Sequence, residues 1–238
     1  MHIFILALGF LLQFNQVSET PTQANKTMKI IYVFDPLCGW CYGFEGVMEK
    51  VQEEYKDQFD FDVLAGGMVL GQNVQPISKM RSFLEGAIPR LEQTTGVKIS
   101  PAYRNNILAS PTVALSSEMP SMVFNYLKSS QTGKEVELAR KIQDLLYDKG
   151  LNTNDIDTYD SLIQDYGMGL SIKKEITSEQ NKQATYSMFQ QSKAMGVSGY
   201  PALLVEVDDQ LYSLSSGYLP EQNLKAKLDQ VLQMFAEE

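Results

Sequence analysis

The chain has 238 residues, a formal net charge of −9 and 44% hydrophobic residues. This length allows one large domain, or one domain that carries a second as an insertion, and the apolar content is enough for a core without disulfides. The acidic balance provides no basic stripe for phosphates, which argues against nucleic acid as a partner. The single histidine, His2, excludes Cys-His proteases, Ser-His-Asp hydrolases and Cys/His zinc sites. We therefore assign no metal site and no cofactor.

The first 27 residues do not resemble a folded element. Residues 3–14 form an apolar run that is too short for a bilayer, which needs roughly 20 apolar residues, so we expect no stable membrane span. The run has the length of a signal-peptide core, and Thr22-Gln23-Ala24 offers a cleavage point, which predicts export to the periplasm or cell envelope. Because Met1-His2 has no Lys or Arg, the alternative is a mis-annotated start: translation would begin at Met28 and the protein would be cytoplasmic.

The first predicted strand covers residues 29–35 and ends just before the only two cysteines, Cys38 and Cys41. A helix is predicted from Cys38 to about residue 57, because apolar residues follow at helical spacing: Phe44, Val47, Met48, Val51 and Tyr55. The free N–H groups and positive dipole end of a helix favour a thiolate. Because bridging a two-residue gap constrains the unfolded chain very little, the pair is predicted to be redox-active rather than structural.

Residues 59–63 alternate between apolar and polar side chains and predict a second strand that ends at Gly66-Gly67. The order strand, helix, strand indicates a right-handed βαβ unit with parallel strands. Residues 75–177 then have a helical pattern throughout, which predicts an all-helical insertion between two parts of one domain, residues 28–74 and 178–238.

Three prolines give local expectations within the insertion. Pro89 should kink or break the helix that carries Ile77 to Leu91. Ser110-Pro111 has the pattern of an N-cap followed by proline at the first helical position, and Pro120 should divide that segment in two. We interpret most apolar residues of the insertion as helical core and assign no site residue there.

The last part of the chain combines a helix, a hairpin and a helix. A helix is predicted from about residue 178 to 195, followed by Gly196-Val197-Ser198-Gly199-Tyr200-Pro201. Residues 202–207 and 210–215 are predicted strands joined by a two-residue turn at Asp208-Asp209. A final amphipathic helix carries Leu224, Leu228, Val231, Leu232 and Phe235.

This order of elements predicts an α/β protein with a thioredoxin fold interrupted after its second strand, and it resembles the DsbA-like branch of the thioredoxin superfamily. The segment Phe34-Asp35-Pro36-Leu37-Cys38-Gly39-Trp40-Cys41-Tyr42-Gly43 is similar to that of the FrnE-like group of predicted disulfide oxidoreductases. The segment from Gly196 to Pro201 resembles the part of that group that precedes its cis-proline strand. The resemblance covers about residues 28 to 236.

The resemblance implies roles for individual residues. Cys38 would be the exposed nucleophile, Cys41 the resolving thiol, and the attack would form a mixed disulfide. Pro201 matches the family's cis-proline, which would leave the backbone of Tyr200 free to pair with an extended substrate. The dipeptide Gly39-Trp40 would tune the redox potential.

The expected function is thiol–disulfide exchange with a protein or small-molecule thiol, together with a redox partner that recycles the site. Gly39-Trp40 lacks the histidine that DsbA has between its cysteines, and Asp35, if close, would disfavour the thiolate. We therefore predict a weaker oxidant than DsbA. Trp40 could equally face substrate or pack against the insertion. A small-molecule isomerase, a kappa-type glutathione transferase and a non-catalytic peptide binder remain alternatives, although the first two usually carry serine at the nucleophile position.

Overall fold

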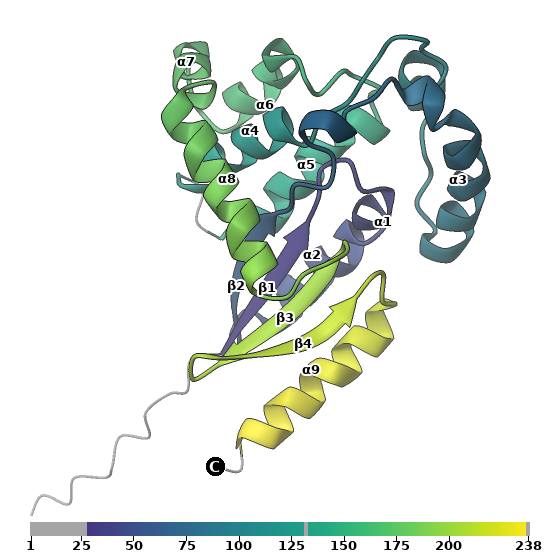
Figure 1. The fold of residues 1–238 in the computed structure, drawn as a ribbon. Helices are drawn as coiled ribbons and strands as arrows, with labels where there is room; N and C mark the ends of the chain where they lie inside the picture. The colour runs from purple at the N-terminus through teal and green to yellow at the C-terminus, as the bar shows by residue number, and fades with distance from the viewer. Residues whose placement is uncertain (1–27, 131–132, 237–238) are drawn as a thin grey trace, which may run out of the picture.

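The computed structural model describes residues 28–130 and 133–236 (Figure 1). The segment to which the signal-peptide and start-site hypotheses apply, residues 1–27, lies outside these residues. Among the helices of the described ranges, none is long and apolar enough to cross a membrane.

A mixed four-stranded sheet with the order β2-β1-β3-β4 forms the centre of the protein. β1 (Met28–Phe34) pairs in parallel with β2 (Asp60–Ala65) and antiparallel with β3 (Ala202–Val207), which pairs antiparallel with β4 (Gln210–Ser216). Because β1 has a neighbour on both sides, it is buried from Ile30 to Phe34. The predicted hairpin is confirmed, and its turn residues Asp208 and Asp209 have φ values of 48° and 63°.

Two helical segments follow β1, and a long series of helices separates β2 from β3. The first two are α1 (Gly39–Tyr42) and α2 (Glu45–Tyr55). The series begins with the short turns η1 (Gly71–Asn73) and η2 (Ile77–Lys79) and continues with α3 (Arg81–Thr95), the π-helical turn η3 (Tyr103–Leu108), α4 (Glu118–Lys128), α5 (Glu135–Tyr147), η4 (Ile156–Tyr159), α6 (Asp160–Asp165), η5 (Leu170–Ile172), α7 (Lys173–Ile176) and α8 (Glu179–Ala194). The chain ends with α9 (Glu221–Ala236).

The helices surround two apolar cores. The larger core joins the sheet to α2, α4, α5, α8 and α9, and the smaller one joins α3 and η3 to the end of α5. In Figure 1, α9 runs below β3 and β4, α4 to α7 gather above the sheet, α8 runs down from them past β1 and β2, and α3 stands at the right. Trp40 packs against both cores. The segment that carries the two cysteines therefore lies where the two cores meet.

The predicted helix from Cys38 to about residue 57 is wrong in one respect, because it is interrupted between α1 and α2 at Gly43-Phe44. Glycine is a weak helix former, and at this position the chain has no room for a side chain. A Cβ atom on Gly43 would lie 2.5 Å from the Cγ2 atom of Thr95 in α3. The interruption therefore falls where α3 presses on the segment, a contact that the local sequence pattern does not reveal.

The expectations for the prolines of the insertion are also corrected. α3 is not broken at Pro89, which is exposed, so water can solvate the carbonyl group that lacks a partner, while the predicted kink stays a prediction. Ser110 does not begin a helix: its hydroxyl accepts hydrogen bonds from the amides of Thr112 and Val113 within an irregular turn. Pro120 lies in the first turn of α4, where a missing N–H leaves no helical hydrogen bond unmade.

Candidate active site

Cys38 is fixed by the turn that connects β1 to α1. Its backbone N–H donates to the carbonyl oxygen of Asp35 at 3.0 Å, and its own carbonyl oxygen accepts from the N–H of Cys41 at 3.0 Å. Cys38 thus occupies the N-cap position of α1, with Cys41 one turn further along. Both are free thiols, and the spacing places them on one side of the helix.

The two thiols are less accessible than the sequence suggested. Cys41 is fully buried, and only 7% of the surface of Cys38 is exposed. The expectation of a solvent-exposed Cys38 is therefore wrong, because the side chain is held against the loop before β3, where it contacts Tyr200. Instead, Cys38 lines a cavity of about 290 Å³ between α1, α3 and the β2–α3 connection.

The environments of the two sulfurs shift their pKa values in opposite directions. A hydrogen bond from the Cys41 thiol, together with the backbone N–H groups of Cys41 and Trp40, lowers the pKa of Cys38, although burial and the Asp35 carboxylate oppose this. Burial raises the pKa of Cys41, and its interaction with Cys38 raises it further. At a given pH the thiolate is therefore favoured on Cys38 and the protonated thiol on Cys41.

Tyr200 and Pro201 lie beside Cys38 although more than 160 positions separate them in the sequence. The Tyr200–Pro201 peptide bond is cis. The Cys38 thiol donates to the carbonyl oxygen of Tyr200 at 3.5 Å. The ring of Tyr200 lies against Gly66 at the end of β2, where a Cβ atom would come within 2.3 Å of the ring. Glycine at this position therefore allows the loop before β3 to approach the cysteines.

Asp35 is buried directly before the cysteine turn and connects three parts of the chain. Its carboxylate accepts hydrogen bonds from the N–H of Leu37 at 2.9 Å, the N–H of Met68 at 2.8 Å and the hydroxyl of Ser117 at 2.9 Å. Burial raises the pKa of Asp35. Its charge raises the pKa of Cys38, in the direction expected from the sequence, but its hydrogen bonds give it a further role as an anchor.

Two residues of α5 hold the same turn and were missed by the sequence analysis. The side-chain amide of Gln143 donates to the carbonyl oxygens of Asp35, Pro36 and Cys38 at 3.1, 3.3 and 3.2 Å. The hydroxyl of Tyr147 donates to the carbonyl oxygen of Leu37 at 2.6 Å. Gln143 lies among apolar helix positions, and only the fold shows that it faces the carbonyl groups of a turn more than 100 residues earlier.

The dipeptide between the cysteines contacts the insertion. A Cβ atom on Gly39 would lie 3.1 Å from the Cδ1 atom of Leu91 in α3, so a larger residue would press against that helix. Trp40 is partly buried, its ring centroid is 6.3 Å from that of Tyr218, and it also lines the cavity. Trp40 packs against the core of the insertion, as one of the two hypotheses has it, and its contact with substrate stays a prediction.

A second carboxyl group is buried behind the cysteines. Glu45, at the start of α2, accepts a hydrogen bond at 3.0 Å from the hydroxyl of Tyr32 in β1, and its other oxygen has no hydrogen-bond partner among the described residues. Burial raises the pKa of Glu45 well above its usual range. Its charge in turn raises the pKa of Cys41. The sequence analysis did not single out Glu45, which lies on the buried side of a helix.

A dithiol at a strand-to-helix junction, facing a cis-proline loop across the end of a β2-β1-β3-β4 sheet, defines a thioredoxin-fold protein with a redox-type site. The sequence matches the family described as DSBA-like thioredoxin domain over residues 29–229, and the chain belongs to this family. The predicted fold, a thioredoxin fold with a helical insertion, is confirmed. A search of curated proteins found no match.

Solved structures show the same fold over most of the chain. A candidate protein disulfide isomerase from Nitrosomonas europaea is 25% identical, with a TM-score of 0.76, and the match covers 88% of this chain and 99% of that one. The cytosolic disulfide reductase DsbM from Pseudomonas aeruginosa is 22% identical, with a TM-score of 0.72 and coverage of 87% and 99%. A 2-hydroxychromene-2-carboxylate isomerase is 13% identical, with a TM-score of 0.59 and coverage of 87% and 98%.

Proposed function

We propose that the protein is a thiol–disulfide oxidoreductase in which Cys38 is the nucleophile and Cys41 the resolving thiol. The observation that carries the proposal is the position of the Cys38 sulfur, which stands at the N-cap of α1, 3.5 Å from the carbonyl oxygen before Pro201 and one helical turn from Cys41. The lowered pKa of Cys38 and the raised pKa of Cys41 support this division of roles, since the thiolate is the attacking form.

In the reducing direction, the Cys38 thiolate attacks one sulfur of a substrate disulfide. The Cys38–substrate disulfide forms, the substrate S–S bond breaks, and the departing thiolate takes up a proton. Cys41 then loses its proton and attacks the Cys38 sulfur, so that the Cys38–Cys41 disulfide forms and the second substrate thiol leaves. The substrate gains two electrons and the protein loses two, and the reverse sequence oxidises a substrate dithiol.

The backbone of Tyr200 is proposed to align an extended substrate beside Cys38, and a redox partner is needed to return the site to its starting state. In this proposal Asp35 tunes the pKa of Cys38, and Gly39 and Trp40 shape the entrance to the sulfur. The two alternative classes differ in what they require. A small-molecule isomerase would not need Cys41 as a resolving thiol, and a peptide binder would need neither sulfur.

Insulin reduction in the presence of dithiothreitol tests the proposal. We expect the full chain to accelerate the reaction, Cys38→Ser to lose the activity, and Cys41→Ser to accumulate a mixed disulfide at Cys38 that mass spectrometry detects. A folded but inactive wild type, or full activity in Cys38→Ser, would contradict the proposal. Circular dichroism of each variant separates loss of chemistry from loss of fold.

A further inference from the structure

The cavity beside Cys38 has a composition that limits what can enter it. Its walls come from the cysteine turn, the β2–α3 connection and one side of α3, with Ile99, Tyr103, Leu115, Leu146 and Tyr147 behind them. Most of the lining is apolar, with Asn73 and Gln75 as the amide side chains. Among the described residues that line it, none carries a formal charge. A carboxylate placed there would lose its hydration without gaining a positively charged partner, which is unfavourable.

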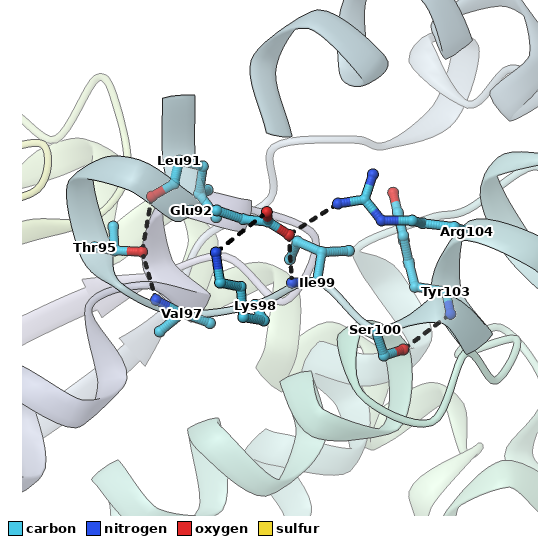
Figure 2. A network of polar contacts seen from close by, with 9 residues as sticks. All are labelled: Leu91, Glu92, Thr95, Val97, Lys98, Ile99, Ser100, Tyr103 and Arg104. Carbon is cyan, nitrogen blue, oxygen red and sulfur yellow. Dashed lines mark hydrogen bonds and ion pairs between the residues drawn. The ribbon is translucent and has the colours of Figure 1, made fainter. Parts of the chain in front are cut away.

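The wall formed by α3 is fixed at both ends, so the cavity is preformed. At the N-terminal end, the guanidinium of Arg81 donates to the carbonyl oxygens of Leu108, Ala109 and Ser110. At the C-terminal end, the carboxylate of Glu92 accepts from the N–H of Ile99 at 3.0 Å and from Arg104 at 2.8 Å (Figure 2). A preformed apolar site avoids the entropic cost of ordering its walls when a ligand enters.

The rim of the cavity is apolar and exposed. Met68, Met80 and Phe83 all line it, and they are 40%, 48% and 69% exposed. A small molecule inside a cavity of about 290 Å³ would leave such a rim in water. A polypeptide that continues beyond the cavity would cover it, and methionine adapts readily to different partners. The rim therefore favours a polypeptide over a small molecule as the occupant.

We propose that this cavity is a side-chain pocket, through which the protein selects polypeptides that carry an aromatic or large aliphatic residue next to the cysteine attacked by Cys38. This inference rests on the proposed function, because it places the substrate sulfur at Cys38. The Tyr200–Pro201 loop is not part of the cavity lining, although Tyr200 touches the Cys38 sulfur. Backbone pairing and side-chain selection would thus occur at separate surfaces around one sulfur. Glutathione, which carries two carboxylates, is disfavoured by the same uncharged lining.

Blocked peptides with a single cysteine, each linked by a mixed disulfide to thionitrobenzoate, test the proposal on the full-length Cys41→Ser variant. Attack by Cys38 forms the Cys38–peptide disulfide and releases the coloured thionitrobenzoate anion. Phe, Ala or Asp is placed before the cysteine in one series and after it in a second. Because a single methylene in an apolar pocket changes discrimination by roughly 10- to 200-fold, we expect the Phe peptide to react at least about tenfold faster than the Ala peptide in one series.

The Asp peptide and the glutathione mixed disulfide are expected to react no faster than the Ala peptide. Equal rates for Phe, Ala and Asp in both series would overturn the pocket while leaving the proposed function intact. Absence of a Cys38 adduct with every peptide would refute the proposed function, and the pocket with it. A benzyl mercaptan mixed disulfide that reacts as fast as the Phe peptide would overturn the choice of a polypeptide.

Two substitutions that each introduce phenylalanine on α3 test whether the cavity is the part of the protein that selects the peptide. Ala87→Phe fills the cavity and should bring the ratio of the Phe and Ala rates close to one, whereas Ser82→Phe, on the exposed side of the same helix, should leave the ratio unchanged. If Ala87→Phe fails to fold, Phe83→Ala trims the exposed rim and should lower the ratio. An unchanged ratio in both Ala87→Phe and Phe83→Ala would place the selection elsewhere.

Discussion

Asp35 combines an electrostatic effect on Cys38 with three hydrogen bonds that hold the cysteine turn. These two properties respond differently to replacement by asparagine. The negative charge disappears entirely, but one carboxylate oxygen becomes an NH₂ group that can no longer accept a hydrogen bond. The substitution therefore separates what the charge does to the thiol from what the hydrogen bonds do for the fold.

We expect Asp35→Asn to lower the pKa of Cys38, because the like charge that opposes the thiolate is removed. The free energy of unfolding should fall by about 1–3 kcal/mol, since a buried donor loses its acceptor. The pKa is measured from the pH dependence of iodoacetamide alkylation at Cys38. Asp57→Asn, a change of the same charge at an exposed position, is the control. A pKa that rises in Asp35→Asn would contradict the assignment.

Glu45 gives a pH dependence of stability with a defined sign. Burial raises its folded-state pKa well above the ordinary value of 4.5, so the folded state holds a proton that the unfolded state releases. This contribution to stability is fully present below pH 4.5 and is lost as the pH rises through the raised pKa. Urea denaturation at a series of pH values should show a smaller loss of stability with rising pH in Glu45→Gln than in the wild type. Parallel curves would show that Glu45 does not titrate in this way.

At the scale of elements, the segment that carries the two cysteines packs against α3 because its glycines and the side chains of α3 that face them have the same spacing. Gly39 and Gly43 are four residues apart, as are Leu91 and Thr95, which lie against them. From its position between the cysteines, Gly39 is predicted only to tune the redox pair. The contact could not be predicted, because α3 begins about 40 residues later and nothing in its own pattern specifies which helix it meets.

Gly43→Ala should destabilise the protein by about 1–3 kcal/mol, because the new Cβ atom would lie 2.5 Å from Thr95 and α3 would have to shift. The matched control is Gly86→Ala, in the interior of α3, where a Cβ atom meets nothing within 4 Å. That substitution should stabilise the protein by up to about 1 kcal/mol through helix propensity alone. Thermal and urea unfolding measure both, and two effects of the same sign would argue against the packing described.

At the scale of the whole molecule, the redox potential reports the balance of all groups around the sulfurs. The Cys38 thiolate is stabilised by the Cys41 thiol and two backbone N–H groups, and opposed by Asp35 and burial. No histidine lies in the part of the chain that the structure describes. We therefore predict a potential clearly below that of DsbA, which is about −120 mV, with each 30 mV corresponding to about 1.4 kcal/mol. Equilibration with glutathione redox buffers measures it, and a value as oxidising as that of DsbA would refute the prediction.

The sequence predicted the fold and the position of the two cysteines because these depend on local signals. The period of the strands, the helical insertion and the turn at Asp208-Asp209 are all encoded within short windows. The roles of Gln143, Glu45 and Tyr147 could not be predicted, because each depends on a contact that exists only after the chain has folded. For the same reason, apolar residues such as Ile88 were interpreted as core, although they also line a cavity beside Cys38.

The close approach of Leu91 to Gly39 has a consequence for the engineering of this protein. In a thiol–disulfide protein, the two residues between the cysteines are the natural positions to exchange when a different potential is wanted. Here the first of them is constrained, since a Cβ atom at position 39 would lie 3.1 Å from the Cδ1 atom of Leu91, and this side chain, which also lines the pocket, would have to give way. Potential and substrate selection are therefore linked through one contact. A redesigned dipeptide with a larger residue at position 39 should therefore be combined with a smaller residue at position 91, which removes this contact.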